Sequence, residues 1–181
     1  LIKPTFNVYF RKKFLGNVAP EIKERAIELA KTFFRLTFLH EKASFCPPNT
    51  SFIAEPKTVA DQIRKYTNIT SFTDVRSMIR SLSQQGIEVG VVPFAQLGLT
   101  DGDLEQAFSV TDGKRCAIFL DSNCSEELLI FNLCHEMCHL FRPEVEITKA
   151  EESFCNEVAA ELVYPQGYFN DRSEKIQQIT S

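Results

Sequence analysis

The sequence contains no apolar run that approaches the roughly 18 residues needed for a membrane-spanning helix. It also lacks a secretion signal, because the basic residues near the amino terminus follow and interrupt the apolar ones. We therefore expect a protein that has no membrane anchor and acts in the cytoplasm. The first residue is Leu1 rather than methionine, so we expect the chain to be a fragment or a processed product.

An overall basic charge is also absent. The chain carries 20 Lys and Arg against 24 Asp and Glu, a formal net charge of −4, whereas nucleic-acid-binding proteins normally have a basic surface. Residues 1–15 are the exception, because they mix aromatic and basic residues and contain no acid. A single basic run is weak evidence. We therefore interpret residues 1–19 as an N-terminal segment or linker and expect no direct nucleic-acid binding.

Six cysteines are present, but without a secretion signal they are expected to be free thiols rather than disulfides. The chain has 181 residues, of which 44% are hydrophobic, which is enough for one globular domain with a sizeable core. We place this domain at residues 20–170, followed by a C-terminal segment over 171–181.

Apolar residues at helical spacing predict three helices in the first half of the chain. Their bounds are Pro20 to a point before Cys46, Thr58 to Tyr66, and Ser71 or Thr73 to about Gln85, after which Gly86 ends the third helix.

Strand patterns follow over residues 87–92, 106–110 and 116–120, and Asp112-Gly113 is typical of a hairpin turn between the last two. Two further helices are predicted, one ending near Phe141 and the other over 149–164. The expected architecture is α+β, with several helices packed with a small three-stranded antiparallel sheet.

Histidines are few, and two of the three lie four residues apart in His135-Glu136-Met137-Cys138-His139. Because a helix turns once every 3.6 residues, His135 and His139 lie on one face, one turn apart. That spacing lets two imidazoles bind one zinc ion, with Glu136 in reach of a water molecule at the metal. The pattern predicts metal-assisted hydrolysis, with a peptide bond as the expected substrate.

A catalytic tetrahedral zinc site takes three protein ligands and leaves the fourth position for water. The third histidine, His40, lies near the end of the first predicted helix, where a capping or surface role is more common than metal binding. We therefore expect a carboxylate ligand. Helical geometry leaves Glu151 and Glu152 nearly tied for this role and turns Glu157 and Glu161 toward solvent.

Together, the two helices resemble the ImmA/IrrE family of zinc metallopeptidases. The matching stretches are HEMCHLF at 135–141 and EESFCNEVAAELVYP at 151–165, and the likeness extends over residues 75–165. The resemblance implies a zincin-like metallopeptidase fold for the α+β domain.

By this resemblance, His135, His139 and Glu152 bind Zn²⁺, which decides between the two glutamates that helical geometry leaves open. Glu136 is then the general base, which takes a proton from the attacking water and delivers one to the leaving amine. Asn156, one turn after Glu152, either orients a metal ligand or makes a local helix hydrogen bond.

One residue departs from the family pattern. Cys138 stands where relatives often have glycine, and its thiol could offer a competing soft ligand. The candidates for an oxyanion donor are Arg142, Tyr164 and Tyr168, and nothing in the sequence selects among them.

The expected function is that of a zinc-dependent endopeptidase that cleaves a regulatory protein at a selected site. The resemblance implies a helix-turn-helix repressor as the protein substrate. The alternative is a non-proteolytic zinc-binding regulator that binds a partner or works beside a DNA-binding module. Residues 1–181 contain no convincing helix-turn-helix of their own.

Overall fold

The computed structural model describes residues 7–12, 19–37, 44–99, 104–111 and 115–165. Within them the predicted α+β class is confirmed. The elements in chain order are β1 (Asn7–Lys12), α1 (Pro20–Thr37), α2 (Pro56–Thr67), α3 (Val75–Gln84), β2 (Ile87–Val92), β3 (Leu104–Thr111), β4 (Cys116–Asp121), α4 (Glu126–Phe141) and α5 (Lys149–Val163).

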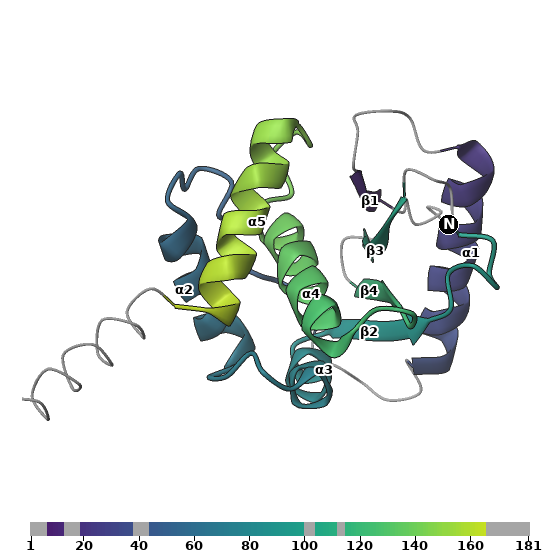
Figure 1. Cartoon of the computed structure of the whole chain (residues 1–181), viewed down its shortest axis with the longest axis horizontal. Coiled ribbons are helices and arrows are strands. Elements are labelled where there is room, and N and C mark those ends of the chain that lie inside the picture. The colour runs from purple at the N-terminus through teal and green to yellow at the C-terminus, as the bar shows by residue number, and fades with distance from the viewer. Residues whose placement is uncertain (1–6, 13–18, 38–43, 100–103, 112–114, 166–181) are drawn as a thin grey trace, which may run out of the picture.

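The sheet lies between helices on its two faces (Figure 1). Helix α1 covers one face, where Ala26, Ala30 and Phe34 pack against Phe108 and Phe119 of the sheet. Helix α4 covers the other face, with α5 and α2 packed beyond it and α3 beside it. The larger of the two cores therefore lies around α4 and contains residues from the sheet and from four helices.

The predicted three-stranded antiparallel sheet is wrong. The sheet has four strands in the order β1-β3-β4-β2, and it is mixed because β2 runs parallel to β4. The first four residues of β2 are all buried, including Glu88, and continuous burial of this kind is typical of a parallel strand covered on both faces.

The fourth strand is β1, which pairs antiparallel with β3 and lies at the edge of the sheet. Its residues belong to the segment that the sequence suggested as a linker. The predicted antiparallel pairing of 106–110 with 116–120 is confirmed by the register of β3 and β4. The Asp112-Gly113 turn itself lies outside the described residues.

Local signals determine most helix ends. Helix α2 begins at Pro56, ahead of the predicted Thr58, because proline suits the first helical turn. Asp74 caps α3 by accepting hydrogen bonds from the backbone amides of Arg76 and Ser77. Gly86 follows that helix with φ 78°, a left-handed conformation that glycine adopts without strain.

The last two helices agree closely with the prediction. The side chains of Ser125 and Thr148 cap α4 and α5, respectively. From Asn132 to Phe141 every residue of α4 is buried, which is expected of a helix packed between a sheet and another helix. All six cysteines are free thiols, as predicted. No helix in the described ranges combines the length and apolar character required to cross a bilayer.

Candidate metal centre

Three donor side chains from two helices converge on one point. His135 and His139 lie one turn apart on α4, and their Nε2 atoms are 3.0 Å from each other. Glu152, in the first turns of α5, places one carboxylate oxygen 3.2 Å from Nε2 of His135 and the other 3.4 Å from Nε2 of His139. The predicted ligand residues are therefore brought together, and both histidines are buried while Glu152 is partly exposed.

The other nitrogen of each imidazole is also engaged. Nδ1 of His135 donates to Oδ1 of Asn156 at 3.0 Å, so the side chain of Asn156 contacts a candidate ligand rather than making only a local helix bond. Nδ1 of His139 lies 3.6 Å from the sulfur of Cys155. A histidine that donates through Nδ1 keeps the Nε2 lone pair for a metal, and such partners usually orient metal-binding imidazoles.

These lone pairs favour a cation at the point of convergence. Two Nε2 lone pairs and a carboxylate face one another, and Oε1 of Glu152 is buried without a hydrogen bond from any residue in the described part of the chain. Burial alone would raise the pKa of Glu152, but without a metal, hydrogen bonds and positive charge from His135 and His139 in their protonated form outweigh burial and hold this pKa at about 2. The carboxylate is therefore ionised at neutral pH.

The residue types and separations are compatible with zinc. Nitrogen and oxygen ligands of a tetrahedral zinc ion lie at about 2.0–2.2 Å from the metal, which puts them about 3.3–3.5 Å from one another. The three observed separations, 3.0, 3.2 and 3.4 Å, are close to that range. Two imidazoles and one carboxylate also form a ligand set found in catalytic zinc sites.

An ion pair separates the two glutamates that helical geometry left tied. Arg142, just after α4, donates from Nε and Nη2 to the two carboxylate oxygens of Glu151, at 2.6 and 3.1 Å. Its Nη1 donates to the backbone carbonyls of Thr50 and Ile53. Glu151 is thus held by a buried cation, and Glu152 is the glutamate that faces the histidines.

We predict that Arg142→Met lowers the free energy of unfolding by about 3–5 kcal/mol, because it leaves the Glu151 carboxylate buried without its cation. Urea denaturation followed by circular dichroism would measure the change. Arg76→Met, at an exposed position on α3, is the control and should change stability by about 0.5 kcal/mol or less. Equal effects of the two substitutions would contradict a structural role for the ion pair.

Glu136 points from α4 toward the sheet. Its Oε2 accepts a hydrogen bond from the hydroxyl of Ser109 on β3 at 2.8 Å, and both residues are fully buried. Ser109 was not among the site residues predicted from the sequence. The available signal was a small polar residue among apolar neighbours in the predicted strand 106–110.

Cys138 belongs to a second group of donors, on the far side of His139 from the first. Its sulfur lies with the sulfur of Cys155 and a carboxylate oxygen of Glu151, each within 4.8 Å of the others. Burial raises the pKa of Cys155, so this thiol stays protonated and donates to Oε1 of Glu151 at 3.7 Å. Cys138 therefore contributes to the packing of α4 on α5 and does not join the two histidines and Glu152.

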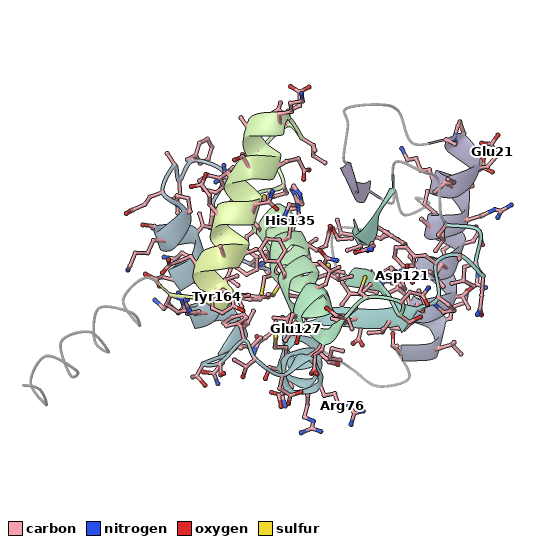
Figure 2. The ribbon with its side chains drawn as sticks, viewed as in Figure 1. Glu21, Arg76, Asp121, Glu127, His135 and Tyr164 are labelled. Atoms are coloured by element: carbon pink, nitrogen blue, oxygen red, sulfur yellow. The ribbon has the colours of Figure 1, made fainter. Side chains whose placement is uncertain are left out.

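Four candidates from the sequence remain: three for the oxyanion donor and His40 as a possible metal ligand. Four of the five guanidinium N–H groups of Arg142 already donate to Glu151 and to the carbonyls of Thr50 and Ile53, which gives this side chain a structural role. Tyr164 is exposed and lines a 460 Å³ surface pocket at the other end of the helix pair from His135 (Figure 2). His40 and Tyr168 lie outside the described residues.

The expectation that Glu161 points into solvent is wrong, because this residue is only 8% exposed. Helix α2 packs against α5 on that side, and Nη2 of Arg64 donates to the backbone carbonyl of Glu161 at 2.6 Å. Glu157, one turn earlier, is exposed as expected.

Comparisons with protein-family models, curated proteins and solved structures found no match to the chain.

Proposed function

We propose that the protein is a zinc-dependent endopeptidase that cleaves a regulatory protein, such as a helix-turn-helix repressor, at a selected site. The observation that carries the proposal is the convergence of His135, His139 and Glu152, with the buried carboxylate of Glu136 on the same helix, next to His135 in the sequence. A structural metal site has no need of a carboxylate that does not bind the metal, whereas hydrolysis needs a base at that position.

Each residue of the site has its own role in the proposed reaction. His135 and His139 would hold zinc through Nε2, and Glu152 would hold it through its carboxylate. Bound zinc supplies Lewis acidity, which lowers the pKa of water toward about 7 and polarises a carbonyl. Glu136 accepts the proton of the attacking water and then delivers a proton to the departing amine. Asn156 keeps the ring of His135 in its binding orientation through the 3.0 Å bond to Nδ1.

Peptide hydrolysis is favoured over other hydrolyses by two considerations. The two helical motifs resemble those of the ImmA/IrrE metallopeptidases, and a zincin-like fold is part of this proposal. In addition, β1 lies at the edge of the sheet, next to the strand that carries Ser109. An extended peptide can add to such an edge by main-chain hydrogen bonds, which suits a protein substrate. We place this activity in the cytoplasm, where free thiols such as the six in this chain persist.

The proposal is tested by removing any metal from the protein and then adding a chosen metal back. Purified protein is stripped of metal with a chelator, supplied with zinc or with magnesium, and incubated with a peptide library and with a helix-turn-helix repressor encoded beside its gene. We expect one zinc ion per chain and cleavage at a single site only in the zinc-loaded sample. Magnesium is the control, because it prefers oxygen ligands and octahedral geometry over imidazoles.

Two results would overturn parts of the proposal. Failure to bind zinc would remove its chemical basis. Binding of zinc without cleavage of any substrate would instead favour the alternative function, a non-proteolytic zinc-binding regulator that acts through a partner or a DNA-binding module.

A further inference from the structure

Ser109 places a hydroxyl group on the sheet face toward α4, in contact with Glu136. Side chains alternate along β3, so Ala107, Ser109 and Thr111 share the face opposite to that of Phe108 and Val110. Ala107 belongs to the core around α4, whereas Phe108 and Val110 belong to the core under α1. Ser109 therefore faces α4 from the middle of the sheet, between its register partners Tyr9 on β1 and Ile118 on β4.

A buried hydroxyl lowers stability unless it is hydrogen bonded. Ser109 is 0% exposed, and burial of a hydroxyl without a partner costs about 1–3 kcal/mol. The partner is Oε2 of Glu136, at 2.8 Å. A bond between a hydroxyl and an ionised carboxylate is stronger than one between neutral groups, so this contact strongly constrains the rotamer of Glu136.

We infer that Ser109 is the positioning residue of the general base. It donates to Oε2 and thereby fixes the plane of the Glu136 carboxylate relative to His135 and His139. The serine hydroxyl can also accept a hydrogen bond, so it matches Glu136 before and after that residue takes a proton. This inference rests on the proposed function, because it assigns Ser109 a role in the same hydrolysis.

A residue that positions the general base affects the rate of the hydrolysis step, kcat, rather than KM. Ser109 is not a metal ligand and is covered by the sheet, so its removal should leave metal binding unchanged. Loss of one hydrogen bond to a charged group corresponds to about a 10- to 100-fold change in an equilibrium or rate. Cysteine has nearly the shape of serine but is a weaker donor, so it should lose less activity than alanine.

The experiment compares Ser109→Ala and Ser109→Cys with the wild type, using Thr111→Ala as the matched control. Thr111 lies on the same face of the same strand, but its hydroxyl donates to the carbonyl of Arg115 at 2.9 Å. Three quantities are measured for each: kcat and KM for cleavage, zinc bound per chain, and the affinity of the zinc-loaded protein for acetohydroxamate. A hydroxamic acid binds zinc as its anion, and a neighbouring base that accepts the released proton strengthens this binding, so the affinity reports on Glu136 without a substrate.

We expect Ser109→Ala to lower kcat about 10- to 100-fold with KM within about twofold of the wild type, and to weaken acetohydroxamate binding about tenfold. The kcat and hydroxamate affinity of Ser109→Cys should lie between those of Ser109→Ala and the wild type. Thr111→Ala should match the wild type, and all variants should bind the same amount of zinc. If Ser109→Ala does not fold, the same comparison is made with Ser109→Cys.

The inference is overturned if the Ser109 variants keep the wild-type kcat and hydroxamate affinity, or if their losses match that of Thr111→Ala, because a purely structural effect would then suffice. These outcomes differ from failure of the proposed function. A wild type that binds zinc and acetohydroxamate but cleaves nothing would remove the peptidase assignment, while the hydroxamate affinities would still decide whether Ser109 positions Glu136.

Discussion

Glu136→Gln is expected to reduce peptide-bond cleavage by about 100- to 10,000-fold, the usual contribution of a general base, while zinc content stays at the wild-type level. Glutamine preserves the size of the side chain, and its amide oxygen can still accept the hydrogen bond that Ser109 donates to Oε2 at 2.8 Å. The amide cannot accept the proton of water, so the chemical step alone is lost.

The matched control for this substitution lies on the same helix. Glu127→Gln, in the exposed first turn of α4, makes the same chemical change far from the site (Figure 2) and should leave cleavage unchanged. Steady-state kinetics and metal analysis of both variants provide the measurement. Cleavage retained by Glu136→Gln would show that another group acts as the base and would refute the proposed mechanism.

The second large effect concerns the metal itself. Glu152→Ala should weaken zinc binding on the order of 100- to 1,000-fold, since protein zinc sites with four ligands bind with about 10–16 kcal/mol in total. Removal of this carboxylate leaves two imidazoles and also takes away the anionic charge that balances the cation. A competition titration against a chromophoric zinc chelator would measure the affinity directly.

Glu157→Ala provides the control for that titration, because Glu157 is an exposed residue of α5. It should bind zinc as the wild type does. If Glu152→Ala bound zinc with unchanged affinity, Glu152 would not be a ligand, and the third ligand would have to come from another residue.

The sequence predicted best those features that depend on neighbours along the chain. The end of α4 and both ends of α5 were predicted within about one residue, because capping and helical periodicity are local. The pairing of His135 with His139 is local for the same reason. Strand order was not predictable in this way: the apolar pattern of residues 87–92 identifies a strand, but it does not show that the partner is β4 and that the pairing is parallel.

The same distinction holds within the site. Helical spacing could not decide whether Glu151 or Glu152 faces the histidines. The decision depends on Arg142, which follows α4 and binds Glu151. Arg142 is itself held by the carbonyls of Thr50 and Ile53, far away in the sequence. Ser109 was missed because its contact with Glu136 spans 27 residues and two elements. The wrong expectation for Glu161 likewise reflects α2, a helix distant in the sequence that covers this part of α5.

The edge strand β1 has a consequence for the order in which the chain is assembled during synthesis. Val8 of β1 pairs with Val110 of β3, so β1 is made before its partner in the sheet and waits until about 100 further residues exist, and closing so long a loop is entropically costly. Glu152 follows later still. A nascent chain therefore carries neither the complete sheet nor the full set of donor atoms, and the protein can gain the proposed activity only after nearly all of the described chain has been translated.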